Sequence, residues 1–184
     1  ILLNLTTEQM AALAKENGFS AAVPLDPSTI RPLEEVRAMC ASNHCHMYDK
    51  NWSCPPGCGT LEECRQQILQ CSRGILVQTI GEIEDSMDFE GMMEVEARHK
   101  ENFVKVTDLL RKDMDILPLG AGSCVRCKVC TYPESPCRFP QKMTHSMEAF
   151  GLLVNQVCKD NGLPYYYGND HIAYTSCFLV KEHV

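Results

Sequence analysis

Four cysteines lie close together in residues 124–137, which read CVRCKVCTYPESPC. Cys124, Cys127 and Cys130 are spaced C-x2-C-x2-C, so one turning loop can direct three sulfurs at a single centre, and Cys137 follows after six more residues. Bacterial ferredoxins hold cubane iron–sulfur clusters with this triplet and a further cysteine. Zinc sites more often use two separated C-x2-C pairs. The spacing therefore favours an iron–sulfur cluster, with zinc as the alternative.

The charges around this motif agree with a metal cluster. The formal net charge of the chain is -7, yet the stretch carries four basic residues and only Glu134 against them: Arg126, Lys128, Arg138 and Lys142. A cubane with four thiolates carries roughly two negative charges, and thiolates need nearby positive charge to stay deprotonated. The other interpretation of these residues is a solvated loop.

The first cysteine run along the chain, at 40–58, has looser spacing than the second run, at 124–137. Its pattern is C-x4-C-x8-C-x3-C, formed by Cys40, Cys45, Cys54 and Cys58. Pro55 and Pro56 stiffen the chain directly after the third cysteine. The run predicts one of three sites: a second cluster, a zinc site in which His44 or His46 replaces a thiol, or a cluster with three protein ligands and one open iron. Each histidine is also consistent with an ordinary loop residue.

Twelve cysteines in 184 residues raise the choice between disulfides and metal ligands. Disulfide-rich domains are small, secreted and poor in core residues, whereas this chain is 45% hydrophobic. Its opening, ILLNL, is too short for the core of a signal peptide. We therefore favour metal ligation and expect a cytoplasmic protein. No run approaches the length of a membrane span, and the negative charge argues against binding to nucleic-acid phosphates.

Helical periodicity appears in several segments. Residues 6–17 and 91–112 fit helices, and 144–161 fits another, with Gly162 as its stop. The stretch TLEECRQQILQC starts with a capping box of Thr60 and Glu63. Its apolar face places Cys64 and Cys71 in the core rather than in a metal site. His99 lies on the apolar face of the helix at 91–112, where a hydrogen-bonded core histidine is the usual outcome.

Short β-rich runs separate these helices. Residues 74–81 predict a buried strand, and 115–122 predict a brief strand or an extended approach to the cysteine loop. Residues 164–180 predict two strands that form a hairpin around Gly168, Asn169 and Asp170. Together these elements predict an α/β or α+β fold. We expect one domain over residues 1–184, a sandwich of a small mixed sheet and flanking helices with two cysteine-rich metal-binding loops, in which residues 1–30 form an N-terminal helical extension.

Four stretches together resemble a known family: NWSCPPGCGTLEECR, EDSMDFEGMMEVEARH, LGAGSCVRCKVCTYPESPCRFP and YYYGNDHIAYTS. The chain is similar, from about Cys40 to its C-terminus, to the uncharacterised prokaryotic family of cysteine-rich predicted metal-binding proteins, which carries a domain of unknown function. The resemblance implies metal binding through the cysteine runs and implies no substrate.

The leading hypothesis is an oxygen-sensitive protein of anaerobic metabolism that holds two 4Fe–4S clusters and passes electrons to a redox partner protein. One alternative is an enzyme whose open iron acts as a Lewis acid on a small substrate, with His99, Asp170 or His171 as candidates for proton transfer. A third hypothesis is an interaction module that zinc stabilises. The sequence contains no Gly-rich phosphate loop, G-x-S-x-G elbow or H-E-x-x-H helix.

Overall fold

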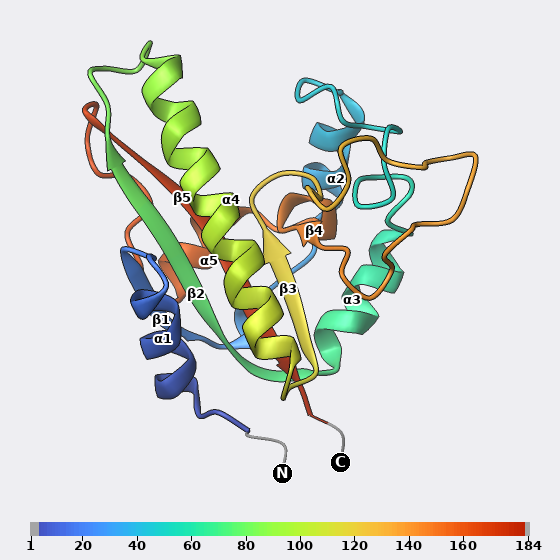
Figure 1. Ribbon diagram of the computed structural model, residues 1–184, viewed down its shortest axis with the longest axis horizontal. Helices are drawn as coiled ribbons and strands as arrows, with labels where there is room; N and C mark the ends of the chain where they lie inside the picture. The colour runs from blue at the N-terminus through green and yellow to red at the C-terminus, as the bar shows by residue number, and fades with distance from the viewer. Residues whose placement is uncertain (1–3, 183–184) are drawn as a thin grey trace.

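One five-stranded mixed sheet forms the middle layer of the protein in the computed structural model, which describes residues 4–182 (Figure 1). Its spatial order is β1-β2-β5-β3-β4. The strands are β1 (Ala21–Leu25), β2 (Cys71–Glu82), β3 (Ile116–Gly120), β4 (His145–Ser146) and β5 (His171–Lys181). β3 and β4 pair parallel, and all other neighbours pair antiparallel. The ends of the predicted domain, residues 1–3 and 183–184, lie outside the described residues.

Helices cover both faces of the sheet, so the predicted α+β sandwich is confirmed. α1 (Thr7–Glu16) and α4 (Phe89–Arg111) pack on one face, over a core that includes Phe103 and Phe178. α3 (Leu61–Leu69), α5 (Val154–Asp160) and the 3-10 helix η2 (Glu148–Phe150) pack on the other, around Phe150 and Leu179. α2 (Glu34–Ala41) lies against η2, and a 3-10 turn, η1, spans Pro27–Thr29. The side chains of neighbouring β5 residues pack into the cores on opposite faces of the sheet, because side chains alternate along a strand.

Several predicted elements form for the predicted reasons. The capping box at α3 is present: the Thr60 N–H donates to the Glu63 carboxylate at 2.7 Å, and the Glu63 N–H donates to the Thr60 hydroxyl at 3.1 Å. Both Cys64 and Cys71 are buried, as the helical spacing indicates. Cys71, however, is the first residue of β2 and not part of the helix. Residues 21–25 and 34–41 form a strand and a helix that the sequence analysis did not predict.

Two predicted elements are wrong. Residues 144–161 do not form one helix, because Gly151 adopts a left-handed φ of 76° and separates η2 from α5. Met147, Phe150 and Val157, three residues of the predicted apolar face, are buried nonetheless, which explains the misleading periodicity. The C-terminal hairpin is also absent: β5 pairs with β2 and β3. The Gln78 side chain instead binds the preceding segment, by donating to the Pro164 carbonyl at 2.7 Å and accepting from the Tyr167 hydroxyl at 2.7 Å.

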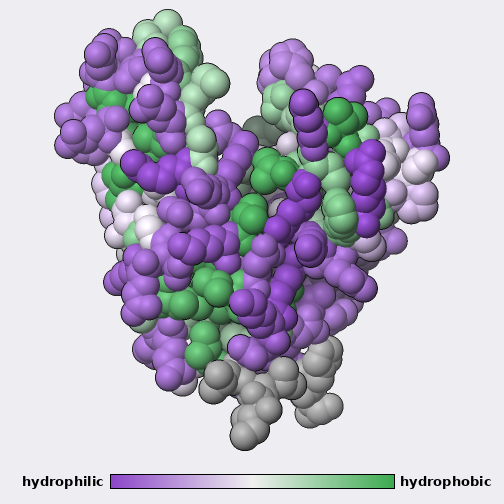
Figure 2. Space-filling model, viewed as in Figure 1, coloured by the Kyte–Doolittle hydropathy of each residue, from purple (hydrophilic) through white to green (hydrophobic). Residues whose placement is uncertain are grey.

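The molecule has two arms. One arm is formed by the C-terminal end of β2, the N-terminal end of β5 and the first turns of α4. The two cysteine loops form the other arm (Figure 1). Figure 2 shows that the surface is hollowed between them. No helix within residues 4–182 is both long and apolar enough to span a membrane.

Candidate metal centre

The second cysteine run surrounds one small cavity. Its loop follows β3, and the cavity is lined by all four of its cysteines: Cys124, Cys127, Cys130 and Cys137. Each is half-buried. Arg126 fixes one side of the loop through a bidentate pair with Asp108, with N–O distances of 2.7 and 2.9 Å. Arg138 fixes the other side by donating to the Val129 carbonyl at 2.7 Å. The fold therefore brings together the four thiols that the spacing singled out.

Three cysteines of the first run line a separate and larger cavity. Cys40, at the end of α2, shares the wall of this space of about 880 Å³ with Cys45 and Cys54. Much of the remaining wall is apolar. His44 and Glu148 also line the cavity. We call this space the three-cysteine cavity.

Cys58, the fourth cysteine of that run, does not line the three-cysteine cavity. The guanidinium Nη2 of Arg37 donates to the Cys58 sulfur at 3.5 Å and to the Cys64 sulfur at 3.3 Å. Arg37 is itself held by a 2.8 Å hydrogen bond from its Nε to the Ala149 carbonyl. The hydrogen bond between the two sulfurs raises the pKa of Cys58 and lowers that of Cys64. The sequence analysis missed this arrangement, because Arg37 lies on a helix that it did not predict.

The two cysteine loops are tied to each other. Trp52 donates from its indole nitrogen to the Ser135 carbonyl at 3.0 Å, and its ring packs edge-on against Tyr132 with centroids 4.8 Å apart. The Tyr132 hydroxyl donates to the Asp49 carboxylate. Burial chiefly raises the pKa of Cys54, and the charge of Cys124 raises it further. The two cysteine sets are therefore close enough for a charge on one set to affect the other.

Glu148 is a residue of the three-cysteine cavity that the sequence analysis missed. Its side chain is open to the cavity but enclosed by protein on most sides, and this burial raises the pKa of its carboxyl group. Among residues 4–182 it has no side-chain hydrogen bond or ion pair. Its backbone carbonyl accepts from the Cys40 thiol at 3.8 Å. No local pattern marked it, because the segment had been predicted as one continuous helix.

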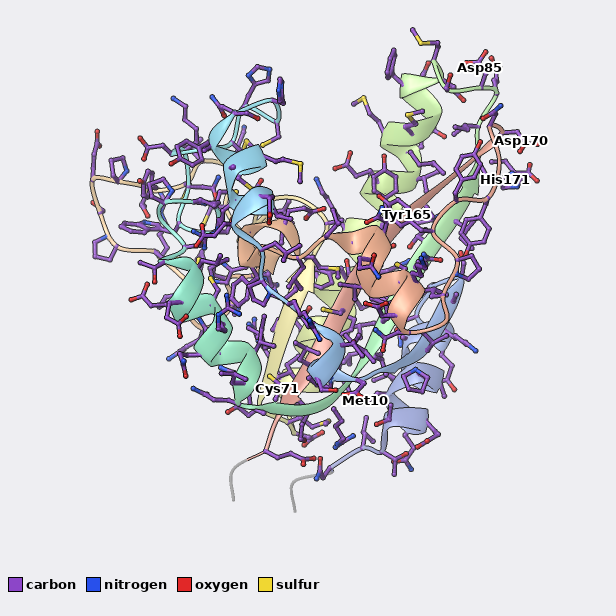
Figure 3. The ribbon with its side chains drawn as sticks, turned by 180° about the vertical axis from the view of Figure 1, so that it is seen from behind. Met10, Cys71, Asp85, Tyr165, Asp170 and His171 are labelled. Atoms are coloured by element: carbon purple, nitrogen blue, oxygen red, sulfur yellow. The ribbon has the colours of Figure 1, made fainter. Side chains whose placement is uncertain are left out.

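The predicted candidates for proton transfer lie elsewhere. His99 is fully buried between α4 and the sheet, where its ring nitrogens contact the hydroxyls of Thr79 at 2.7 Å and Ser176 at 2.6 Å. Burial lowers the pKa of His99 to about 3. The Nδ1 of His171 lies 2.8 Å from the Asp170 carboxylate. Figure 3 shows both at the tip of the β2–β5 arm, far from the arm that carries the cysteine loops.

As arranged here, no three His, Cys, Asp or Glu side chains within residues 4–182 are placed to hold a single metal ion. A family model described as "Predicted metal-binding protein (DUF2284)" matches residues 23–180. The match includes both cysteine loops and confirms the resemblance that the motifs indicated. No curated protein and no solved structure matches the chain.

Proposed function

The chain belongs to the DUF2284 family of predicted metal-binding proteins, and we propose that it is an iron–sulfur protein that carries two 4Fe–4S clusters and passes electrons to a partner protein. One observation carries the proposal: the four thiols of the C-x2-C-x2-C…C motif line a single cavity. A 4Fe–4S cluster takes one thiolate on each iron and so holds its ligands around a cage. A single zinc ion, by contrast, needs its four ligands to converge on one point.

The charges of the second loop support the same choice of cofactor. Arg126 and Arg138 are held in place at the loop by the contacts described above, and such cations would offset the roughly two negative charges of a cubane with four thiolates. A bound cluster would supply reversible one-electron chemistry. The residues of the chain would hold it, limit the access of water and set its electrostatic surroundings.

Electron transfer is supported by the position of the two cysteine sets. Cys54 and Cys124 lie close enough for the charge of one to affect the other, and the intervening backbone is fixed through Ser53 and Trp52. Two clusters at these sites would be neighbours within one arm, which is the arrangement that an electron relay requires.

The three-cysteine cavity favours a second candidate function. Only three cysteines of the first run face this space, and Cys58 is held by Arg37 instead. We infer that a cluster held by Cys40, Cys45 and Cys54 keeps one iron free of protein thiolate. Such an iron can act as a Lewis acid on a small substrate. The cavity of about 880 Å³ provides space for that substrate, with Glu148 in its wall.

The deciding experiment is an iron and acid-labile sulfide count on protein purified without oxygen. We expect about eight of each per chain, since two cubanes contribute four each. C130S and C54S should each remove roughly half of both, one cluster per variant. The matched control is C158S, because Cys158 is buried between α5 and the sheet and contacts Gln78. Stoichiometric zinc without sulfide would replace this proposal with a zinc-stabilised interaction module.

A spectroscopic titration separates the two candidate functions. Cyanide added to the reduced wild-type protein should shift the electron paramagnetic resonance signal of the first cluster if that cluster has an open iron. The shift should persist in C58S and vanish in C54S. If neither cluster responds, every iron already has a protein ligand. The electron-transfer function is then retained and the enzyme function is rejected.

A further inference from the structure

We propose that Cys58 and Cys64 form a redox-active dithiol, separate from both metal sites, that exchanges with small disulfides. The proposal uses two cysteines that the preceding function leaves without a role. It does not depend on which metal the cysteine loops bind.

The geometry of Arg37 carries the inference. One guanidinium nitrogen lies 3.5 Å from the Cys58 sulfur and 3.3 Å from the Cys64 sulfur, so both sulfurs accept from the same donor. Cys64 is fixed on α3, beyond the capping box at Thr60, while Cys58 lies in the short turn before that helix. The two sulfurs are therefore neighbours in the folded protein, and a bond between them needs only a local adjustment of the turn.

Cys58 and Cys64 differ in burial, and this difference decides which of them reacts first with a small disulfide. Cys58 is half-buried and lines a cavity of about 470 Å³, together with Trp52, Cys137 and His145. Cys64 has no exposed surface. A small disulfide that enters this cavity meets Cys58 first, and Cys64 can then reach only the sulfur of Cys58. A carboxylate in the wall, Glu134, disfavours anionic disulfides.

The exchange proceeds in two balanced steps. The Cys64 thiolate takes the proton of Cys58 as the Cys58 sulfur attacks one sulfur of the small disulfide; the S–S bond of that disulfide breaks, and its first sulfur leaves as a thiol with a proton from solvent. The Cys64 sulfur then attacks the Cys58 sulfur, and the second thiol leaves with the proton of Cys64. The protein dithiol is oxidised by two electrons, and one small disulfide is reduced to two thiols. The reverse sequence reduces the Cys58–Cys64 disulfide with two molecules of the small thiol and re-forms the small disulfide.

The test uses the anaerobically purified full chain and 2-hydroxyethyl disulfide as the probe. We expect peptide mapping by mass spectrometry to recover Cys58 joined to Cys64, with the iron content of the sample unchanged. C64S should instead retain one probe molecule on Cys58, because the second step is lost. C58S should form neither product, and C71S, which removes another buried cysteine, should behave like the wild type.

Three results would overturn the inference. One is a failure of the wild type to form this disulfide when C64S captures the probe. Another is the pairing of Cys58 with Cys54 or Cys137. The third is a loss of iron in C58S without a Cys58–Cys64 product in the wild type, which would make Cys58 a cluster ligand. Because C58S and C64S are read independently, a folding defect in one of them still leaves the other to decide. The iron count of the untreated wild type tests the proposed function separately.

Discussion

The hydroxyl of Ser53 accepts a 2.9 Å hydrogen bond from the backbone N–H of Cys124. The same hydroxyl donates to the Asn51 side chain at 2.6 Å, and Ser53 is almost completely buried. One residue of the first cysteine loop thus fixes the first cysteine of the second loop. The spatial relation between the two candidate metal sites depends on this contact and on the Trp52 contacts beside it.

Replacing Ser53 by alanine should loosen the connection between the loops. S53A leaves the Cys124 N–H without its acceptor and removes one of the two hydrogen bonds that Asn51 Oδ1 accepts from Ser53, which costs about 1–3 kcal/mol of the free energy of unfolding. Urea unfolding measures the loss. The control is S72A, because Ser72 is exposed and bonds to Glu182, and its change should stay within about 0.5 kcal/mol. Equal stability of both variants would show that the Ser53 contact does not hold the loops together.

Alanine variants of Cys64 and Cys71 test whether these two cysteines pack in the core or bind metal. C64A and C71A should keep the full iron content, since both side chains are buried in the core behind α3. Each should lower the free energy of unfolding by about 1–2 kcal/mol, as for the loss of a small buried side chain. Iron analysis and urea unfolding are the two measurements. Loss of iron in either variant would move that cysteine into a metal site.

Gly151 and Gly162 provide a matched pair of left-handed glycines, with φ of 76° and 72°. A Cβ on Gly162 meets no atom within 4 Å, so G162A should cost only the backbone strain of about 1–2 kcal/mol. A Cβ on Gly151 would approach Leu61 Cδ1 to 2.6 Å and the Leu33 nitrogen to 3.0 Å. G151A should therefore cost about 1–3 kcal/mol more, through overpacking. Equal melting temperatures would show that the site relaxes freely.

The buried His99 should make the protein less stable in mild acid. Its pKa falls from 6.5 to about 3 on folding. Between these values the unfolded chain binds a proton that the folded protein does not, so the free energy of unfolding decreases as the pH decreases. By roughly pH 5 this histidine should cost about 2 kcal/mol relative to neutral pH.

Comparison of two glutamine variants isolates this effect. H99Q should remove the part of the pH dependence that His99 causes, whereas H44Q, in an exposed loop position, should retain it. Urea unfolding at several pH values provides the measurement. An unchanged pH dependence in H99Q would mean that other groups cause the acid sensitivity.

The sequence by itself determined the elements whose signals are local. The capping box at Thr60 and the apolar faces of α3 and α4 depend on residues within one or two turns, so their spacing was sufficient. The same holds for the C-x2-C-x2-C triplet, because three thiols in one short loop cannot lie far apart. The alternation of β2 and β5 between two cores likewise agrees with the predicted sandwich.

Only the tertiary structure decided the contacts between segments far apart in the chain. β5 pairs along its length with the long strand β2 and over a shorter stretch with β3, so it gains more backbone partners than a local hairpin would provide. Arg37 draws Cys58 toward Cys64 and away from the other cysteines of its run, although all four share one spacing pattern. Glu148 enters the three-cysteine cavity because Gly151 ends the segment that looked like a continuous helix. Spacing shows which side chains can meet, but the fold sets the direction in which each one points.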